Sequence, residues 1–359
     1  MRLKGQNSCR DGGDAILWAE GRVRIIDIAE ELGISTATVS NVIHGKTKRV
    51  SAQTVKRVQQ KLEERGYIPN MAATLLAQNS SRIIGVVIKD HEKYEGQLLM
   101  DPFVASSLNY LADEIDRSGH FMMVKKAKNI MEAVQFASMW NMVGMVILSF
   151  CADEYQELRS RIHIPFVVYD GYFNNEGRIC NIQIDNLDGG RQVGEHLRTL
   201  GHRRVLCIAD NQECMDLQRY QGLCQGLGCE ADFLKIPMQK KARATFYQER
   251  LAYLRQYTAV FAVSDYYAAD LMGFLHSAQV RLPDELSIVG FDDSVLCDQV
   301  TPSLTSVRQD GARRARIALE LLERMGREPD FHENCLVSVR LIPRNSTAGI
   351  CGQPDRLCD

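Results

Sequence analysis

The stretch IIDIAEELGISTATVSNVIHG, residues 25–45, contains two short amphipathic patterns on either side of a glycine. Apolar residues on one helical face predict a first helix, which carries Ile25, Ile26, Ile28, Ala29 and Leu32. Gly33 can adopt the left-handed conformation that ends a helix, and Ser35 is a favourable N-cap for a second helix over 36–43. Because Ala29 is small, the two helices can cross closely. The spacing predicts a helix-turn-helix unit.

The second helix has an inward and an outward face. Val39, Val42 and Ile43 are expected to pack inward, whereas Thr36, Ala37, Ser40 and Asn41 face outward, where the major-groove readers of such units lie. Ser51 is suited to cap a longer third helix, which has Val55, Val58 and Leu62 inward and ends at Gly66. The alternative is a generic helical hairpin with solvated outward residues. The basic loop GKTKR, residues 45–49, favours nucleic-acid binding.

Charge is distributed unevenly along the 359 residues. Between Arg22 and Arg82 there are ten Lys/Arg and five Asp/Glu residues, a balance of +5. Because the whole chain has a net charge of −2, the remainder carries −7. A basic N-terminal module on an acidic body indicates nucleic-acid contact at one end only.

Breaks in the sequence pattern predict the domain boundaries. Residues 1–21 show no sustained periodicity, so we expect a disordered extension followed by the helix-turn-helix domain at 22–68. The apolar segment within 69–81 is too short to be stable as an isolated helix, which predicts a linker that orders on binding. The glycine- and proline-containing end, residues 347–359, is expected to be a tail.

Beyond Arg82, Val/Ile-rich runs alternate with amphipathic helical stretches, a pattern typical of a parallel, doubly wound α/β sheet. The runs form two groups, the first at 83–88, 121–124, 143–148 and 166–169, the second at 182–184, 205–208, 259–263 and 286–291. Two groups predict two Rossmann-like lobes, the first over about 82–180 and 310–338, the second over about 181–309 and 339–346. Ligands of such folds bind at the carboxyl ends of the strands.

Composition excludes several classes of protein. The content of 45% apolar and 25% charged residues is that of a globular protein, and no run approaches the roughly 20 apolar residues that span a bilayer. The first 20 residues make a poor signal peptide, so we expect a cytoplasmic protein. The eleven cysteines include no Cys-x-x-Cys pair, which predicts buried thiols and no metal site. Without a Gly-x-Gly-x-x-Gly after a strand or a catalytic-triad spacing, we expect neither an enzyme nor a cofactor.

From Val23 to Ala348 the chain resembles the LacI/GalR family of transcriptional regulators. The resemblance is carried by the stretch over 25–45, RVSAQTVKRVQQKLEERGYIPN (49–70), MAATLLA (71–77), NLDGGRQVGEHLRTLGHRRV (186–205), LPDELSIVGFDD (282–293) and TPSLTSVRQD (301–310). It implies a three-helix helix-turn-helix headpiece with a hinge helix. Two lobes of the periplasmic-binding-protein-like type I fold are implied to follow.

The resemblance also implies how the headpiece meets DNA. Base-reading positions fall on Thr36, Ala37 and Asn41, which offer a hydroxyl, a methyl suited to thymine and an amide suited to adenine. Phosphate contacts are assigned to Ser35, Thr38, Ser40, Lys46, Lys48 and Arg49. The hinge, with Ala72, Ala73 and Leu76, is implied to enter the minor groove and to insert the leucine between base pairs. Packing of Leu75 and Leu76 on a domain interface is the alternative.

Four positions match the family's effector contacts by motif, namely Asp170, Arg219, the pair Ser264-Asp265, and Asp292. Phe103, which follows Asp101-Pro102, is expected to add an apolar platform. Three of the four positions follow predicted strands, and Arg219 lies near the start of a helix. Carboxylates and a guanidinium hold hydroxyl groups by charge-assisted hydrogen bonds. The ordinary alternatives are a carboxylate that caps the next helix and a solvated helical arginine.

Taken together, these features predict a repressor that binds double-stranded operator DNA as a homodimer, because two half-sites require two headpieces. A small-molecule effector, sugar-like in chemistry, is expected to bind between the lobes and change operator affinity. Two alternatives remain for the control of DNA binding, a partner protein and a purine-like co-repressor. No membrane contact is expected.

Overall fold

The structure is a computed structural model that describes residues 23–68, 81–150, 152–171 and 179–350. The chain divides into two compact units, residues 1–79 and 80–359. The expected extension at 1–21 and almost all of the expected hinge at 69–81 lie outside the described residues. None of the described helices is long and apolar enough to cross a bilayer.

The first unit is a three-helix headpiece made of α1 (Ile25–Leu32), α2 (Thr36–Ile43) and α3 (Ala52–Glu64), with a short 3-10 turn, η1 (Thr47–Arg49), before α3. Its core is small and closed, because Ile28, Ala29, Val39, Val42 and Val58 are buried against one another. Gly33 has the left-handed φ of 64° that the turn after α1 requires. Ser35 and Ser51 cap α2 and α3 through their hydroxyl groups, as the sequence predicts.

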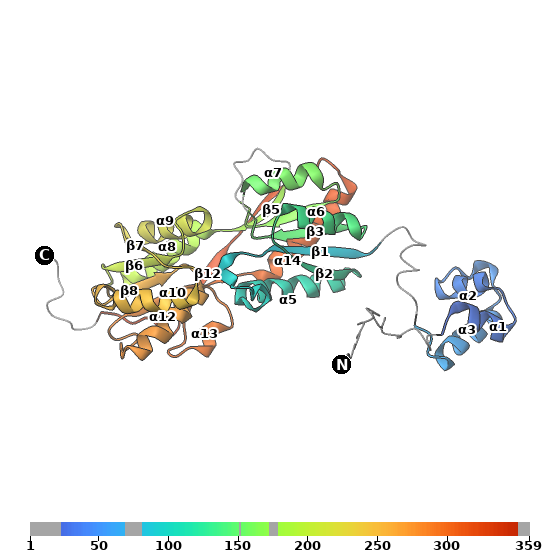
Figure 1. The fold of residues 1–359 in the computed structure, drawn as a ribbon, viewed down its shortest axis with the longest axis horizontal. Coiled ribbons are helices and arrows are strands. Elements are labelled where there is room, and N and C mark those ends of the chain that lie inside the picture. The colour runs from blue at the N-terminus through green and yellow to red at the C-terminus, as the bar shows by residue number, and fades with distance from the viewer. Residues whose placement is uncertain (1–22, 69–80, 151, 172–178, 351–359) are drawn as a thin grey trace, which may run out of the picture. The chain divides into compact units, whose positions relative to one another are not determined.

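The second unit contains two six-stranded sheets, each with its own helices (Figure 1). The first sheet has the order β11-β5-β4-β3-β1-β2 and the second has the order β12-β10-β9-β8-β6-β7. Every pair is parallel except β10 with β12. Parallel strands place their carboxyl ends at one edge of each sheet, which is where ligands of such folds bind.

The elements of the first lobe surround its sheet. Its strands are β1 (Ile83–Lys89), β2 (Phe121–Ala127), β3 (Gly144–Leu148), β4 (Phe166–Tyr169), β5 (Cys180–Ile184) and β11 (Asn334–Val337). Its helices are η2 (Glu92–Tyr94), η3 (Leu98–Met100), α5 (Pro102–Arg117), α6 (Ile130–Met139), α7 (Ala152–Arg161) and α14 (Gly311–Arg327). Helix α14 packs on α5 and on β3, β4 and β5, so it belongs to this lobe although it follows the second lobe in sequence.

The second lobe is built in the same way. Its strands are β6 (Val205–Ala209), β7 (Asp232–Lys235), β8 (Ala259–Ala262), β9 (Ser287–Asp292), β10 (Thr305–Gln309) and β12 (Val339–Ile342). Its helices are α8 (Asn186–Thr199), α9 (Cys214–Leu227), α10 (Lys240–Glu249), α11 (Leu251–Leu254), α12 (Asp265–Ser277) and α13 (Leu296–Gln299). The chain passes between lobes three times, after β5, after β10 and between β11 and β12.

Three expectations from the sequence are wrong. The strand at 182–184 was expected in the second lobe, but β5 pairs with β4 and β11, so the first crossing follows Ile184. The sheets are not wholly parallel, because β12 runs antiparallel to β10. The predicted burial of the cysteine thiols is wrong for Cys214 and Cys229, which are exposed.

Helices α8 and α9 cross so closely that glycines form their contact. A Cβ placed on Gly222 would lie 2.0 Å from the Leu187 carbonyl oxygen, and one on Gly190 would lie 2.1 Å from the Arg219 carbonyl oxygen. Gly194 and Gly226 make equally close approaches one turn along. The seam therefore fixes α9, and with it Arg219, against the start of α8.

Candidate functional site

The outward face of α2 carries the residues that the sequence predicts for base reading. Thr36, Ala37 and Asn41 are exposed, while Val39 and Val42 on the opposite side are buried. Because the helix is held from behind by α1 and α3, its exposed face is presented on a rigid support. The first turn of a helix presents backbone N–H groups that favour an anion such as phosphate, although in α2 the Thr38 N–H is already bonded to the Ser35 hydroxyl.

The predicted phosphate-binding residues surround this face, but two of them, Ser35 and Thr38, also form hydrogen bonds that cap α2. The Ser35 hydroxyl accepts a hydrogen bond from the Thr38 backbone N–H (3.1 Å) and lies 2.9 Å from the Thr38 hydroxyl. Ser40 is half-buried. The basic loop exposes Lys46, Lys48 and Arg49. The hinge residues Ala72, Ala73 and Leu76 lie outside the described residues.

The effector positions gather at the carboxyl ends of strands from both sheets. Asp170 follows β4 of the first sheet, whereas Ser264 follows β8 and Asp292 ends β9 of the second. Asp170 and Asp292 have φ values of 53° and 117°, in the region that non-glycine residues rarely adopt. Such backbone strain is common where side chains are held for binding.

Arg219 is a buried cation held by neutral groups. Its Nε donates to Asn186 Oδ1 (2.8 Å), its Nη1 donates to the Val263 carbonyl oxygen (2.5 Å), and its guanidinium lies 3.7 Å from the Phe291 ring centre. Among the described residues no carboxylate lies within salt-bridge distance of it. Burial raises the pKa of the nearby carboxyls of Asp216 and Asp292, and the charge of Arg219 opposes part of that rise.

A chain of hydrogen bonds connects the two lobes at Asp292. The Gln309 amide donates to Asp292 Oδ1 (2.7 Å), and Gln309 Oε1 accepts from Arg314 Nη1 (2.7 Å). Arg314 Nη2 then pairs with Asp170 Oδ2 (2.6 Å). Sequence reasoning identified Asp170 and Asp292 but missed Gln309 and Arg314. Gln309 lies within the quoted TPSLTSVRQD stretch, so its place at a strand end was a usable signal.

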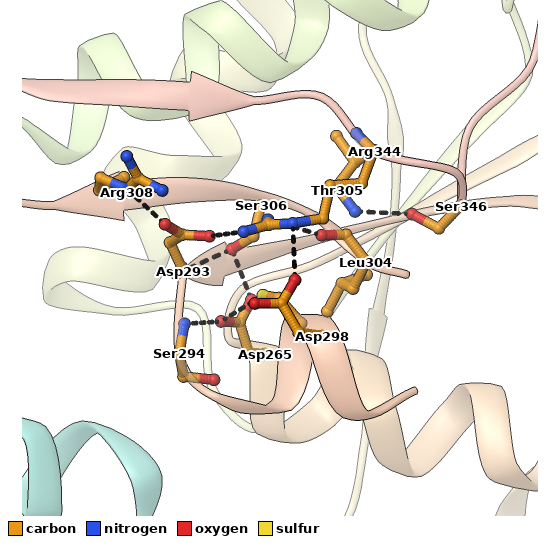
Figure 2. Close-up of polar contacts among 11 residues, drawn as sticks. Asp265, Asp293, Ser294, Asp298, Leu304, Thr305, Ser306, Arg308, Arg344 and Ser346 are labelled. Carbon is orange, nitrogen blue, oxygen red and sulfur yellow. Dashed lines mark hydrogen bonds and ion pairs between the residues drawn. The ribbon is translucent and has the colours of Figure 1, made fainter. Parts of the chain in front are cut away.

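Asp265 has a different setting from the one expected. Its side chain is 1% exposed, and both carboxylate oxygens already accept hydrogen bonds, Oδ1 from the Ser306 hydroxyl (2.5 Å) and Oδ2 from the Ser294 backbone N–H (2.6 Å) and the Cys297 thiol (3.2 Å). Burial raises the pKa of Asp265 although these donors oppose the change. Asp265 therefore anchors the loop after Asp292, and its predicted contact with an effector stays a prediction (Figure 2).

The same loop is fixed from its other side. Asp293 Oδ2 pairs with Arg308 Nε (2.5 Å) and its Oδ1 with Arg344 Nη2 (2.6 Å), and Arg344 Nε also lies 3.3 Å from Asp298 Oδ1 (Figure 2). Because the residue after Asp292 is held by two arginines, the position of Asp292 is set by the second lobe itself.

The two remaining positions are near this group. The Ser264 hydroxyl caps α12 by accepting from the Tyr267 backbone N–H (3.4 Å), and the residue is half-buried. Phe103 lies in the first turn of α5, with its ring centre 5.8 Å from the Arg314 guanidinium. A ring beside a buried cation provides an apolar wall next to charged groups.

Charged groups from the two lobes also influence one another. Burial raises the pKa of Asp292 well above its usual range; Asp265 in the same lobe and Asp101 in the other add to the rise, while Arg219 opposes it. Lys93 is exposed, and desolvation by itself would lower its pKa. The net direction is upward because four groups raise it, namely Tyr94, Asp101, Asp210 and Asp216. The strand ends of the two sheets therefore share one electrostatic environment.

Two surface hollows lie away from the predicted effector residues. One of about 380 Å³ is lined by α14 residues that include Arg313 and Arg316, and one of about 490 Å³ lies between α10 and α12. Neither contains any of the predicted effector residues. Among the residues that the structure describes, no cluster of His, Cys, Asp and Glu could hold a metal ion.

Comparison with known protein families gives two matches, which fall on the two units. Residues 24–70 match the family of bacterial regulatory proteins, lacI family, and residues 195–347 match a periplasmic binding protein-like domain. These matches, with the helix-turn-helix headpiece and the two parallel-sheet lobes, define a DNA-binding transcriptional regulator with a ligand-binding-protein fold attached.

Relatives over nearly the whole chain carry the same kind of description. The chain is 26% identical to the HTH-type transcriptional regulator CelR of Thermobifida fusca, covering 89% of this chain and 96% of that protein. It is 28% identical to the ribose operon repressor of Halalkalibacterium halodurans (90% and 97%) and to the HTH-type transcriptional repressor PurR of Pasteurella multocida (90% and 98%). The chain therefore resembles the lacI family of bacterial regulatory proteins, both in its residues 24–70 and in the relatives that it matches.

Solved structures agree on the fold. A lac repressor dimer bound to operator and an anti-inducer matches with a TM-score of 0.78 at 22% identity, covering 91% of this chain and all of that one. A CelR–cellobiose complex matches with a TM-score of 0.65 at 23% identity, covering 90% and 100%. The predicted fold class is thus confirmed.

Proposed function

We propose that the protein is a dimeric repressor whose affinity for operator DNA changes when a small sugar-like molecule binds between the lobes. The observation that carries the proposal is the pair of sites in one chain, an exposed α2 face on a closed headpiece and a set of carboxylates and buried guanidinium groups at the strand ends. The names of a relative, a ribose operon repressor, and of solved complexes with cellobiose and ribose support the sugar class.

On DNA, α2 would lie in the major groove. Asn41 can form two hydrogen bonds with adenine, while Thr36 and Ala37 can contact a thymine methyl. Lys46, Lys48 and Arg49, exposed next to α2, would contact phosphates and set the register without reading sequence. Leu76 of the hinge would unstack a central base step, as minor-groove wedges do.

Effector binding would act through the groups that link the lobes. A ligand that hydrogen-bonds to Asp292 competes with the Gln309 amide, which is bonded in turn to Arg314 and so to Asp170. A change at one lobe is therefore coupled to the other, and a shift in lobe arrangement would alter the population of the DNA-binding state.

The DNA-reading proposal is tested with selected operator sites. After selection of bound sequences from a random pool, Asn41→Ala should lose roughly 1–3 kcal/mol of affinity, about ten- to a hundredfold, and should relax specificity at one base pair. Lys48→Ala should weaken all sequences alike and reduce the salt slope by about 1. An Asn41→Ala protein that selects the same sites with the same affinity would refute the assignment.

The effector proposal is tested by titration. Sugars, purines and candidate partner proteins are compared for their effect on thermal unfolding and on operator release. A sugar that changes both supports the proposal. A purine with that effect would favour the second candidate, a purine-like co-repressor, which the PurR relatives support. A response only to a protein would favour the partner-controlled alternative.

The dimer is tested by light scattering at operator-binding concentrations. Two headpieces are needed for a two-fold operator, so the expected mass is that of two chains of 40.5 kDa. A monomer, or a tetramer that resists salt, would contradict this part of the proposal.

A further inference from the structure

Three buried polar atoms around Arg314 have no hydrogen-bond partner among the described residues. They are the Tyr169 hydroxyl, Asp170 Oδ1 and Arg314 Nε. Tyr169 is 4% exposed and Arg314 is 1% exposed, so protein atoms rather than solvent surround both. A buried polar group without a partner destabilises the ligand-free protein, which makes three at one place unusual.

The three atoms belong to side chains that touch one another. The Arg314 guanidinium lies 4.5 Å from the Tyr169 ring centre, and its Nη2 pairs with Asp170 Oδ2. Tyr169 ends β4, and the left-handed φ of 53° at Asp170 breaks the strand alternation, so both side chains reach the same arginine. Through Gln309, Arg314 is connected to Asp292 of the second lobe.

The unpaired atoms have the hydrogen-bonding capacity of one hydroxyl group. Arg314 Nε–H can only donate, Asp170 Oδ1 accepts, and the Tyr169 hydroxyl can donate. A hydroxyl group has one donor and two acceptor positions, so its hydrogen-bonding capacity matches the three atoms in number and in kind. A carboxylate or a carbonyl has no proton for Asp170, and an ammonium cannot accept from Arg314.

We infer that Tyr169, Asp170 and Arg314 form a subsite for one hydroxyl group of the effector, with Arg314 as its specificity-determining residue. This inference rests on the proposed function, because it narrows the effector class to a neutral polyol or sugar that has a hydroxyl group at one required position. Phe103, whose ring centre is 5.8 Å from the Arg314 guanidinium, is placed to contact an apolar face of the same molecule.

The first test uses the ligand-free full-length protein. Tyr169→Phe removes a hydroxyl that has no partner, so its melting temperature should equal or exceed that of the parent. The matched control is Tyr257→Phe, because Tyr257 is equally buried at 4% but its hydroxyl bonds to Asp232 Oδ2 (2.8 Å) and Tyr253 (2.6 Å). The control should melt roughly 2–4 °C lower. An equal loss in Tyr169→Phe would show that the hydroxyl is already partnered, for example by a trapped water, and would overturn the subsite.

The second test identifies the hydroxyl. D-glucose, D-galactose, D-ribose, D-xylose and cellobiose are screened at millimolar concentration, and the monodeoxy analogues of the best binder are compared by calorimetry. One analogue should bind roughly ten- to a hundredfold more weakly to the parent, because it leaves buried groups unpaired. That penalty should shrink in Tyr169→Phe and in Arg314→Lys, which keeps a cation for Asp170 but lacks Nε–H. Tyr257→Phe should keep the full penalty.

The outcomes separate the subsite from the proposed function. A sugar that binds with identical deoxy penalties in the parent and in both variants overturns the subsite and leaves the function standing. If none of the five sugars binds, the sugar class of the proposed function is wrong and the hydroxyl assignment fails with it. A loss of the penalty confined to Tyr169→Phe and Arg314→Lys supports the subsite.

Discussion

Replacing Gly222 by alanine tests the seam that positions Arg219. The added Cβ would lie 2.0 Å from the Leu187 carbonyl oxygen and 2.8 Å from the Arg191 backbone nitrogen, and neither atom can move independently of α8. Since the shortest ordinary contact between carbon and oxygen is about 3.3 Å, the helices must separate by about 1.3 Å locally. Overpacking of this kind costs about 1–3 kcal/mol, and rigid backbone on the other side favours the upper end.

The higher helix propensity of alanine offsets part of this cost. Alanine gains about 1 kcal/mol over glycine inside a helix, so the net loss should be about 1–2 kcal/mol, or roughly 2–8 °C in the melting temperature of a unit of this size. The control is Gly273→Ala in α12, where a Cβ meets nothing within 4 Å. That variant has the same helix gain without the clash and should melt higher than the parent.

The assay is thermal unfolding of the parent and of the two variants, followed by calorimetry with an identified effector. Because Gly222 is three residues from Arg219, separation of the helices should also displace Arg219 Nε from Asn186 and weaken effector binding in Gly222→Ala alone. The reasoning is refuted if Gly222→Ala melts as high as Gly273→Ala, since the close approach of α8 and α9 would then not exist.

Three further predictions follow from the sites. Leu76→Ala should weaken operator binding and reduce DNA bending in a gel-shift assay without unfolding the headpiece, whereas an effect confined to Leu75→Ala would place the wedge one residue earlier. Arg219→Ala and Asp292→Ala should raise the effector concentration for operator release about ten- to a hundredfold, and a ligand that stabilises both variants as well as the parent would place the site elsewhere. Burial raises the pKa of Asp216 to about 6, so the protonated carboxyl stabilises the fold below the usual carboxyl pKa, and this contribution is lost as the pH rises through 6. The melting temperature of Asp216→Asn should therefore rise relative to that of the parent between pH 4 and 7. A constant difference between the two melting temperatures would contradict this.

The headpiece was predictable because the local sequence signals for its helices agree with its fold. Hydrophobic spacing, Gly33 and the two serine caps each require only nearby residues, and the structure follows all of them. The central strands were predictable for a similar reason, since continuous Val/Ile runs mark strands buried on both faces.

The edge strands and the interactions between lobes were not predictable in the same way. β7 (DFLK) and β11 (NCLV) lie at sheet edges, where polar residues interrupt the apolar pattern. The position of β5 depends on its partner rather than on its own sequence. Arg314 looked like one more cation on an amphipathic helix, and only the fold shows that it is buried against Asp170, which is 144 positions away in the chain.

The three passages between the lobes have a consequence for synthesis of the protein on the ribosome. The headpiece core is complete once residues 23–62 have emerged, so it can fold early. The first lobe, in contrast, lacks α14 and its edge strand β11 until residue 337 has been made, and the second lacks β12 until residue 342. A nascent or prematurely ended chain therefore has a complete headpiece core but an incomplete effector domain.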